Sequence, residues 1–149
     1  MWPSLKPSDR ASIVGVIDPQ SSSTAKVTAW LDASKFQNYL ALIEVGVLGA
    51  SATVDAKLQQ ATDSSGSNPK DITGKAITQL TKVGTDDSKQ VMINLHQDEL
   101  DAANNYCFFQ LSVTPATAAS LIAAQVLGFD PRYAPATDFD AATVDEVVG

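Results

Sequence analysis

Period-two alternation of apolar and polar residues recurs along this chain, and no other feature of the sequence limits the fold as strongly. In residues 53–59, Val54 and Leu58 share one face of an extended chain, and polar residues occupy the other. Residues 90–96 and 106–113 alternate in the same way. Because successive side chains of a β-strand point to opposite faces, this pattern predicts half-buried strands. Further strand candidates are residues 12–17, 26–31, 39–48 and 76–83.

The segments between these strands are short and rich in turn-forming residues. Residues 61–71 concentrate Ser, Gly, Asn and Pro, residues 84–87 resemble a tight polar turn, and residues 98–105 are a loop or a single helical turn. No candidate strand is followed by the long amphipathic helix that a parallel crossover needs. The 149 residues are the length of one ordinary domain. The sequence therefore predicts an all-β fold: a single-domain antiparallel β-sandwich or barrel, jelly-roll-like, with about eight strands.

Two segments fit either a strand or a helix. Residues 114–128 have a Thr where an N-cap would lie, a Pro at the first helical position, an Ala-rich interior and a Gly at the end, all of which suit a helix. The same residues continue the spacing of the strands and suit a last strand that is buried on both faces. Residues 35–45 have a weaker form of this ambiguity. We favour a strand for residues 114–128 and keep the helix as the alternative.

The two ends of the chain differ from the middle. We expect an N-terminal arm at residues 1–11, the β-sandwich at residues 12–134 and an acidic C-terminal arm at residues 135–149, with both arms ordered only against another surface. The stretch LGFDPRYAP, residues 127–135, joins the last strand to the second arm. Pro131 biases the preceding Asp130 toward extended geometry. We expect Phe129 and Tyr133 to pack the arm, and Arg132 to form an ion pair within or between subunits.

All of the net charge lies toward the C-terminus. Residues 90–149 contain eight acidic residues and only one cation, Arg132, which accounts for the formal charge of −7. No window clusters the cations that neutralise phosphates, so direct binding to DNA or RNA is not predicted. Charged residues make up 18% of the chain, against about 25% in ordinary domains, so much of the surface is small and polar or is covered by a partner. No apolar run approaches the length of a membrane span.

The residues with catalytic or metal-binding chemistry are isolated. His96, the only histidine, is interpreted as a polar residue where a strand leaves the sheet, because a transition-metal site usually needs several His or Cys ligands. Cys107, the only cysteine, is expected to be a buried structural thiol in a chain kept in a reducing cytoplasm. Glu44 is expected on an outer face without a second carboxylate beside it. No catalytic residue, cofactor or metal site is predicted, and the chain is not expected to be an enzyme.

Three segments together resemble a family of small virion proteins of tailed bacteriophages that are often encoded near the major capsid gene. They are IEVGVLGASATVDAKLQQATDSSGSNPKDITGKAITQLT, VMINLHQDELDAANNYCFFQLSVTPATA and VLGFDPRY. The resemblance covers roughly residues 27–135 and rests on the order of these phrases rather than on one motif. The Ala-rich residues 114–124 and the acidic tail have no counterpart with a known role in it.

This resemblance implies a capsid cement, or decoration, protein of a siphophage. Such a protein binds the major capsid protein on the outside of the head, commonly as a homotrimer, after assembly in the host cytoplasm. Alternatives are a head–tail connector or tail protein and, less favoured, a small carbohydrate-binding β-sandwich or hydrolase. The side chains that we expect at interfaces are Trp2, Arg10, Phe129, Arg132, Tyr133 and Phe139.

Overall fold

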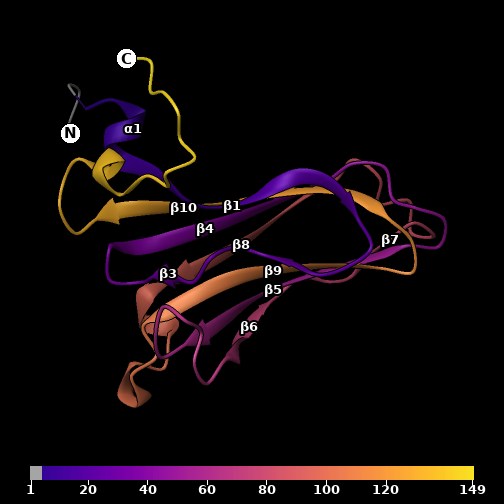
Figure 1. The fold of residues 1–149 in the computed structure, drawn as a ribbon, viewed down its shortest axis with the longest axis horizontal. Coiled ribbons are helices and arrows are strands. Elements are labelled where there is room, and N and C mark those ends of the chain that lie inside the picture. The colour runs from indigo at the N-terminus through magenta and orange to yellow at the C-terminus, as the bar shows by residue number, and fades with distance from the viewer. Residues whose placement is uncertain (1–4) are drawn as a thin grey trace.

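The computed structural model describes residues 5–149 as two antiparallel β-sheets with a shared core (Figure 1). The four-stranded sheet has the order β1 (Ala11–Ser22), β10 (Ser120–Pro131), β4 (Phe36–Val45) and β8 (Gln90–His96). The six-stranded sheet has the order β2 (Lys26–Val27), β9 (Phe108–Ala116), β5 (Thr53–Ala61) and β6 (Lys70–Ala76), with β3 (Leu31–Asp32) beside β9 and β7 (Leu80–Thr81) beside β5. The short helices are α1 (Pro7–Arg10), η1 (Gln97–Glu99), η2 (Ala102–Asn104) and η3 (Ala136–Phe139).

The strands pair in a nested order, the first in the sequence with the last and so on toward the middle of the chain. β1 pairs with β10, β2 and β3 pair with β9, β4 pairs with β8, and β5 pairs with β6 and β7. Each partner in this nested series runs antiparallel, as in one long hairpin that is rolled up so that alternate pairs enter opposite sheets. This connectivity is that of a jelly roll. The predicted all-β, antiparallel, jelly-roll-like sandwich is therefore confirmed.

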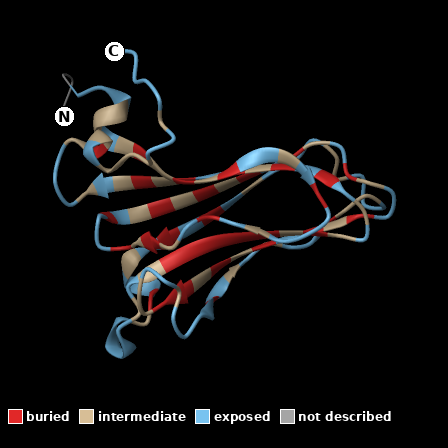
Figure 2. Ribbon diagram, viewed as in Figure 1, coloured by how far each residue is buried: buried red, intermediate tan, exposed pale blue. Residues whose placement is uncertain are grey.

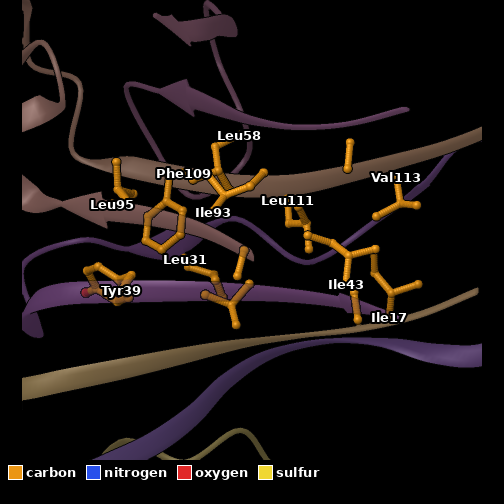
Figure 3. Packing of buried hydrophobic residues seen from close by; sticks show 14 of the residues in the cluster. Ile17, Leu31, Tyr39, Ile43, Leu58, Ile93, Leu95, Phe109, Leu111 and Val113 are labelled. Carbon is orange, nitrogen blue, oxygen red and sulfur yellow. The ribbon is translucent and has the colours of Figure 1, made fainter. Parts of the chain in front are cut away.

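The core fills the space between the two sheets and follows the predicted alternation. Val54 and Leu58 of β5 point inward with exposed fractions of 0% and 1%. Phe109 of the neighbouring β9 belongs to the same core layer, and Ile43 of β4 and Leu95 of β8 extend it from the opposite sheet (Figure 3). Figure 2 shows the buried positions alternating with intermediate or exposed ones along several of the long strands. Burial of each such side chain contributes about 1.5–3 kcal/mol, so this layer supplies most of the stability.

Both ambiguous segments are strands, and the helix alternative is wrong for each. Residues 35–45 contain β4, and residues 114–128 contain the end of β9 and most of β10. Between them, Thr117 has a φ of 72° in the turn that carries the chain from one sheet to the other. β10 pairs with β1 on one side and β4 on the other. Ladder bonds on both sides outweigh the local helix preference of its alanines, because strand formation depends mainly on cross-strand packing.

Two predicted strands differ from the structure. Residues 26–31 form only β2 and β3, because the hydroxyl of Thr28 accepts a hydrogen bond from the Leu111 amide at 3.1 Å and so interrupts the ladder. Residues 76–83 are mostly outside the sheet. The strand that pairs with β5 is formed mainly by Lys70–Ala76 instead, and its first two residues fall in the predicted connector at residues 61–71. In both places a side-chain hydrogen bond or a register shift decides the outcome, and alternation alone does not reveal either.

Candidate functional site

The expected interface residues gather at one end of the sandwich. Trp2 lies outside the described residues. Arg10 ends α1, Phe129 lies near the end of β10, Arg132 and Tyr133 follow that strand, and Phe139 ends η3. Figure 1 shows α1, η3 and the end of β10 side by side at this end, which agrees with the contacts between these elements. The fold therefore brings five of the six residues to one region, although their role in binding stays a prediction.

The C-terminal segment folds back on its own domain. The ring of Phe139 is half-buried and meets the ring of Phe36 edge-on at 5.5 Å between centroids. A carboxylate oxygen of Asp140 accepts hydrogen bonds from the Ser12 hydroxyl at 2.6 Å and from the Ile13 amide at 3.1 Å. The Ala141 amide donates to the Ile13 carbonyl at 2.7 Å. This segment thus orders against β1 and satisfies backbone groups on the outer edge of that strand.

The joint after β10 has a geometry that the sequence did not predict. Asp130 has a φ of 55°, in the left-handed region, so the expected extended conformation is wrong. The Asn38 side-chain amide donates to its carboxylate at 2.7 Å, and Asp tolerates the left-handed region better than most residues, which together hold this turn. The Arg132 guanidinium lies 5.9 Å from the ring centroid of Tyr133. It forms no ion pair within residues 5–149, so only an ion pair between subunits remains as a prediction.

Cys107 is exposed, so the expected buried thiol is wrong. The strand begins one residue later, at Phe108, and Phe109 is the first side chain of β9 in the core. Cys107 is two residues before Phe109 and so continues the series of inward-facing positions, but it lies beyond the end of the core layer. Its sulfur is 3.7 Å from the Thr62 carbonyl oxygen.

His96 ends β8 and caps the short helix η1. Its Nδ1 accepts a hydrogen bond from the Asp98 amide at 3.3 Å. The backbone amide of His96 donates a hydrogen bond to the Glu99 carboxylate at 2.8 Å. Within residues 5–149 no group of three or more His, Cys, Asp or Glu is arranged to hold a metal ion. The same described residues include no helix long and apolar enough to span a bilayer.

Most of the lowered carboxylate pKa values belong to surface ion pairs. A hydrogen bond from the Lys57 ammonium, 2.9 Å from Asp71, lowers the pKa of that carboxyl. A hydrogen bond from Lys70 lowers the pKa of Asp101 in the same way. Burial raises the pKa of the Tyr39 hydroxyl, which accepts from one backbone amide and donates to one backbone carbonyl. These shifts have structural causes and identify no acid–base pair.

The surface that stands out is the outward side of the four-stranded sheet, which we call the outer sheet face. The register places aliphatic and Met side chains of adjacent strands in two rows across it: Ile13, Leu127 and Leu40 in one, and Val16, Leu42 and Met92 in the other. Polar side chains surround and interrupt the rows: Asn38, Glu44, Gln90, Asn94, His96 and Gln125. Met92 is 64% exposed, and Leu121 near one end is 48% exposed.

Charge is nearly absent from the outer sheet face. Glu44 is the one Lys, Arg, Asp or Glu at the outward, paired positions of these four strands, and it is exposed as predicted. The six-stranded sheet presents the opposite character. On its outer side Asp71 accepts from Lys57 and from Gln59, and Asp55 accepts from Gln79. One outer surface of the sandwich is therefore solvated and charged, and the other is apolar with amides around it and the Lys75–Glu99 ion pair at its β8 edge.

The edges of the four-stranded sheet are protected, while its face is open. The C-terminal segment covers β1 at Ile13, and the register of β1 shifts between Ile17 and Gln20, around Pro19. At the other edge, the Lys75 ammonium donates to the Asn94 carbonyl of β8 at 2.8 Å. Prolines, irregular register and lysines are common devices that prevent edge-to-edge pairing. A partner that uses this sheet would therefore meet it through the face.

The sequence contains a signal for this surface. β4 and β10 have apolar residues at successive positions, such as Leu40, Ala41, Leu42 and Ile43, instead of strict alternation. That pattern is typical of strands covered on both faces. Alternation along one strand indicates which side chains face the core. Only the register of the four strands shows that their outward apolar side chains form one surface.

Comparison with known proteins assigns no function to this chain. No protein-family model matches the chain, and no curated protein matches it. Among solved structures, the chain is similar to one from the naturally occurring empty particles of cowpea mosaic virus, with 14% identity and a TM-score of 0.42 over 87% of this chain and 88% of that chain. A chain of broad bean stain virus gives 11% identity and a TM-score of 0.45, covering 97% of both chains. A chain of the Bacillus endospore appendages, which are disulfide-linked pili, gives 11% and 0.38 over 86% and 96%.

Proposed function

We propose that this protein is a structural component of a tailed-phage virion, a decoration protein that binds the outer surface of the head and stabilises contacts between major capsid protein subunits. The observation that carries its structural, self-assembling part is the outer sheet face, an apolar and almost uncharged surface that is open in the single chain. Monomeric proteins rarely leave such surfaces uncovered unless another molecule binds there. Contact with the capsid is assigned to the joint after β10. The sequence resemblance supplies the virion context, since a jelly roll alone is compatible with many functions.

In this proposal the end of the sandwich that holds the joint after β10 meets the capsid. Tyr133 is 68% exposed. The Arg132 guanidinium beside it forms no ion pair with a carboxylate within residues 5–149. Asp145 and Glu146 are exposed on the segment that follows η3 and would pair with basic capsid loops. Each such contact is weak, but several copies that engage together bind tightly because the effective concentration is high.

Self-association belongs to this proposal as well. The resemblance implies trimers, whereas the flat outer sheet face fits a two-fold pair. Either assembly would present several copies of the Arg132 and Tyr133 region to a capsid lattice.

Binding to empty expanded capsids tests the function. Purified protein is expected to co-sediment with capsids that lack it, at micromolar concentration, and to raise their melting temperature. The double variant Arg132→Ala, Tyr133→Ala is expected to bind at least about 10-fold more weakly, since two exposed anchors are lost. Val83→Ala is the matched control, because Val83 is 85% exposed and follows β7, away from the joint. No co-sedimentation of the wild-type chain would contradict the proposal.

The alternative within the virion is a connector or tail protein. Electron microscopy of intact particles separates the two, because a decoration protein occupies hundreds of sites over the shell and a connector forms one ring.

A further inference from the structure

We propose that the outer sheet face docks against the same face of a second copy of this chain, across a two-fold axis. The inference deepens the proposed function, since it names the partner for self-association, and it rests on that function only for its biological use. The two-fold contact predicts a dimer in solution in place of the trimer that the resemblance implies.

Charge favours a second copy over a basic partner. The chain has a formal charge of −7, so two copies repel one another over most of their surfaces. The outer sheet face is where this repulsion is weakest, because Glu44 is the one carboxylate at its outward paired positions and lies beside Gln90, toward one end of the β4–β8 ladder. A basic partner would need carboxylates near the centre, where Leu42 and Gln125 lie. A charge-depleted centre is also the usual composition of protein–protein interfaces.

The polar groups on the outer sheet face suit a self-complementary contact. Gln90, Asn94 and Gln125 carry side-chain amides, each of which both donates and accepts hydrogen bonds. In a two-fold contact each surface meets a copy of itself, so donors and acceptors have to be matched by the same residues on the partner. Amides meet that condition, whereas a face of lysines or of carboxylates does not.

The size of the face predicts a reversible dimer. Four strands spaced by about 4.8 Å are about 19 Å wide, and the seven paired positions from Asn38 to Glu44 extend about 24 Å at about 3.4 Å per residue. The flat area is then about 450 Å² per copy and about 900 Å² for the pair, before the relief of the side chains adds to it. Stable specific interfaces bury roughly 1,200–2,000 Å², so this contact lies below that range, among weak and transient contacts. We expect a dissociation constant in the micromolar range.

Sedimentation velocity of the full chain measures this contact without any capsid. Between about 1 and 500 μM, the sedimentation coefficient is expected to rise from that of a 15.7 kDa monomer to that of a dimer. Leu42→Lys puts a cation at the centre of the face and is expected to weaken dimerisation at least about 100-fold, because two unpaired charges would be buried in each dimer. Met92→Lys, at a position that is 64% exposed, gives the same test with little risk to folding. Thr114→Lys, on the outer side of β9 opposite Asp55, is the matched control and is expected to dimerise normally.

Three results would overturn the inference: a monomer over the whole range, a trimer, or a dimer that both lysine variants on the outer sheet face leave intact. Circular dichroism confirms that each variant is folded. The capsid experiment is independent of this one. A monomeric chain that binds capsids contradicts the two-fold contact and leaves the proposed function standing, whereas a dimer of the expected kind that binds no capsid supports the contact and contradicts the function.

Discussion

Gly128 provides a sharp test of the packing that joins β10, the core and the C-terminal segment. It lies on the inner side of β10, opposite Ser12 and Tyr39 on the flanking strands. A Cβ atom at this position would be 2.5 Å from Cδ2 and 2.6 Å from Cγ of the Phe36 ring. Phe36 is 1% exposed and stands edge-on to both Tyr39 and Phe139. The variant Gly128→Ala therefore forces a fully packed ring to move.

The expected cost follows from two opposing effects. Overpacking of a filled core destabilises by about 1–3 kcal/mol, and the pairing of β10 on both sides resists a backbone shift that would relieve it. Replacing Gly by Ala also reduces the freedom of the unfolded chain, which stabilises by about 0.4–1 kcal/mol. With the overpacking cost near the upper end of its range, we expect a net loss of about 2 kcal/mol. For a domain of this size that lowers the melting temperature by about 4–8 °C.

Urea unfolding of the wild type and of Gly128→Ala gives the free energy directly. Gly46→Ala is the control, because its new methyl group would lie 3.0 Å from Cβ of Leu121, a contact that a shift of a few tenths of an ångström relieves. It should change the stability by less than about 1 kcal/mol. In a double-mutant cycle with Phe36→Leu, the paired variant should be at least about 1 kcal/mol more stable than the sum of the single effects. If Gly128→Ala were as stable as the wild type, the described packing of the Phe36 ring against Gly128 would be wrong.

Further predictions concern the core, the C-terminal segment and acid stability. Tyr39→Phe removes a buried hydroxyl that bonds to two backbone groups and should lower the free energy of unfolding by about 1–3 kcal/mol in urea; no loss would show that these bonds add nothing. Asp140→Ala removes the acceptor that holds the Ile13 amide, so that amide should exchange faster with deuterium while amides of β4 keep their rates. The pKa values of Asp71 and Asp101 are lowered in the folded state by their lysine partners. The stability that they contribute is then complete above the unfolded pKa of about 4 and is lost as the pH falls through their lower folded pKa values. The melting temperature should change little from pH 7 to pH 5 and fall below about pH 4; a fall that begins near pH 6 would contradict this.

The fold was predictable from the sequence where one face of a strand is buried and the other is wet. Val54 and Leu58 alternate with polar neighbours, and the same holds for Ile93 and Leu95, so β5 and β8 were identified correctly. The assignment of residues 114–128 was harder, since an Ala-rich segment with apolar residues on both faces lacks a clear alternation of apolar and polar residues. Its pairing with two neighbouring strands decides its conformation, and that information is not local.

The candidate site was only partly predictable. The sequence singled out Arg132 and Tyr133, and the structure places them at one end of the sandwich. It did not reveal the outer sheet face, because that surface depends on the register between strands that are far apart in the sequence, such as Ile13 opposite Leu127. Cys107 was misplaced for a related reason: parity along a strand gives the direction of a side chain but not the point where the opposite sheet ends.

The central proposal is that this chain works as a repeated structural subunit on a virus shell. The most direct measurement is electron cryo-microscopy of intact particles that contain it, at a resolution that separates β-sheets. We predict two-sheet jelly-roll density in many symmetry-related copies on the outer surface of the head, with the residues after β10 turned toward the shell. A single ring at one vertex, or particles without such density despite the presence of the chain in the infected cell, would contradict the claim.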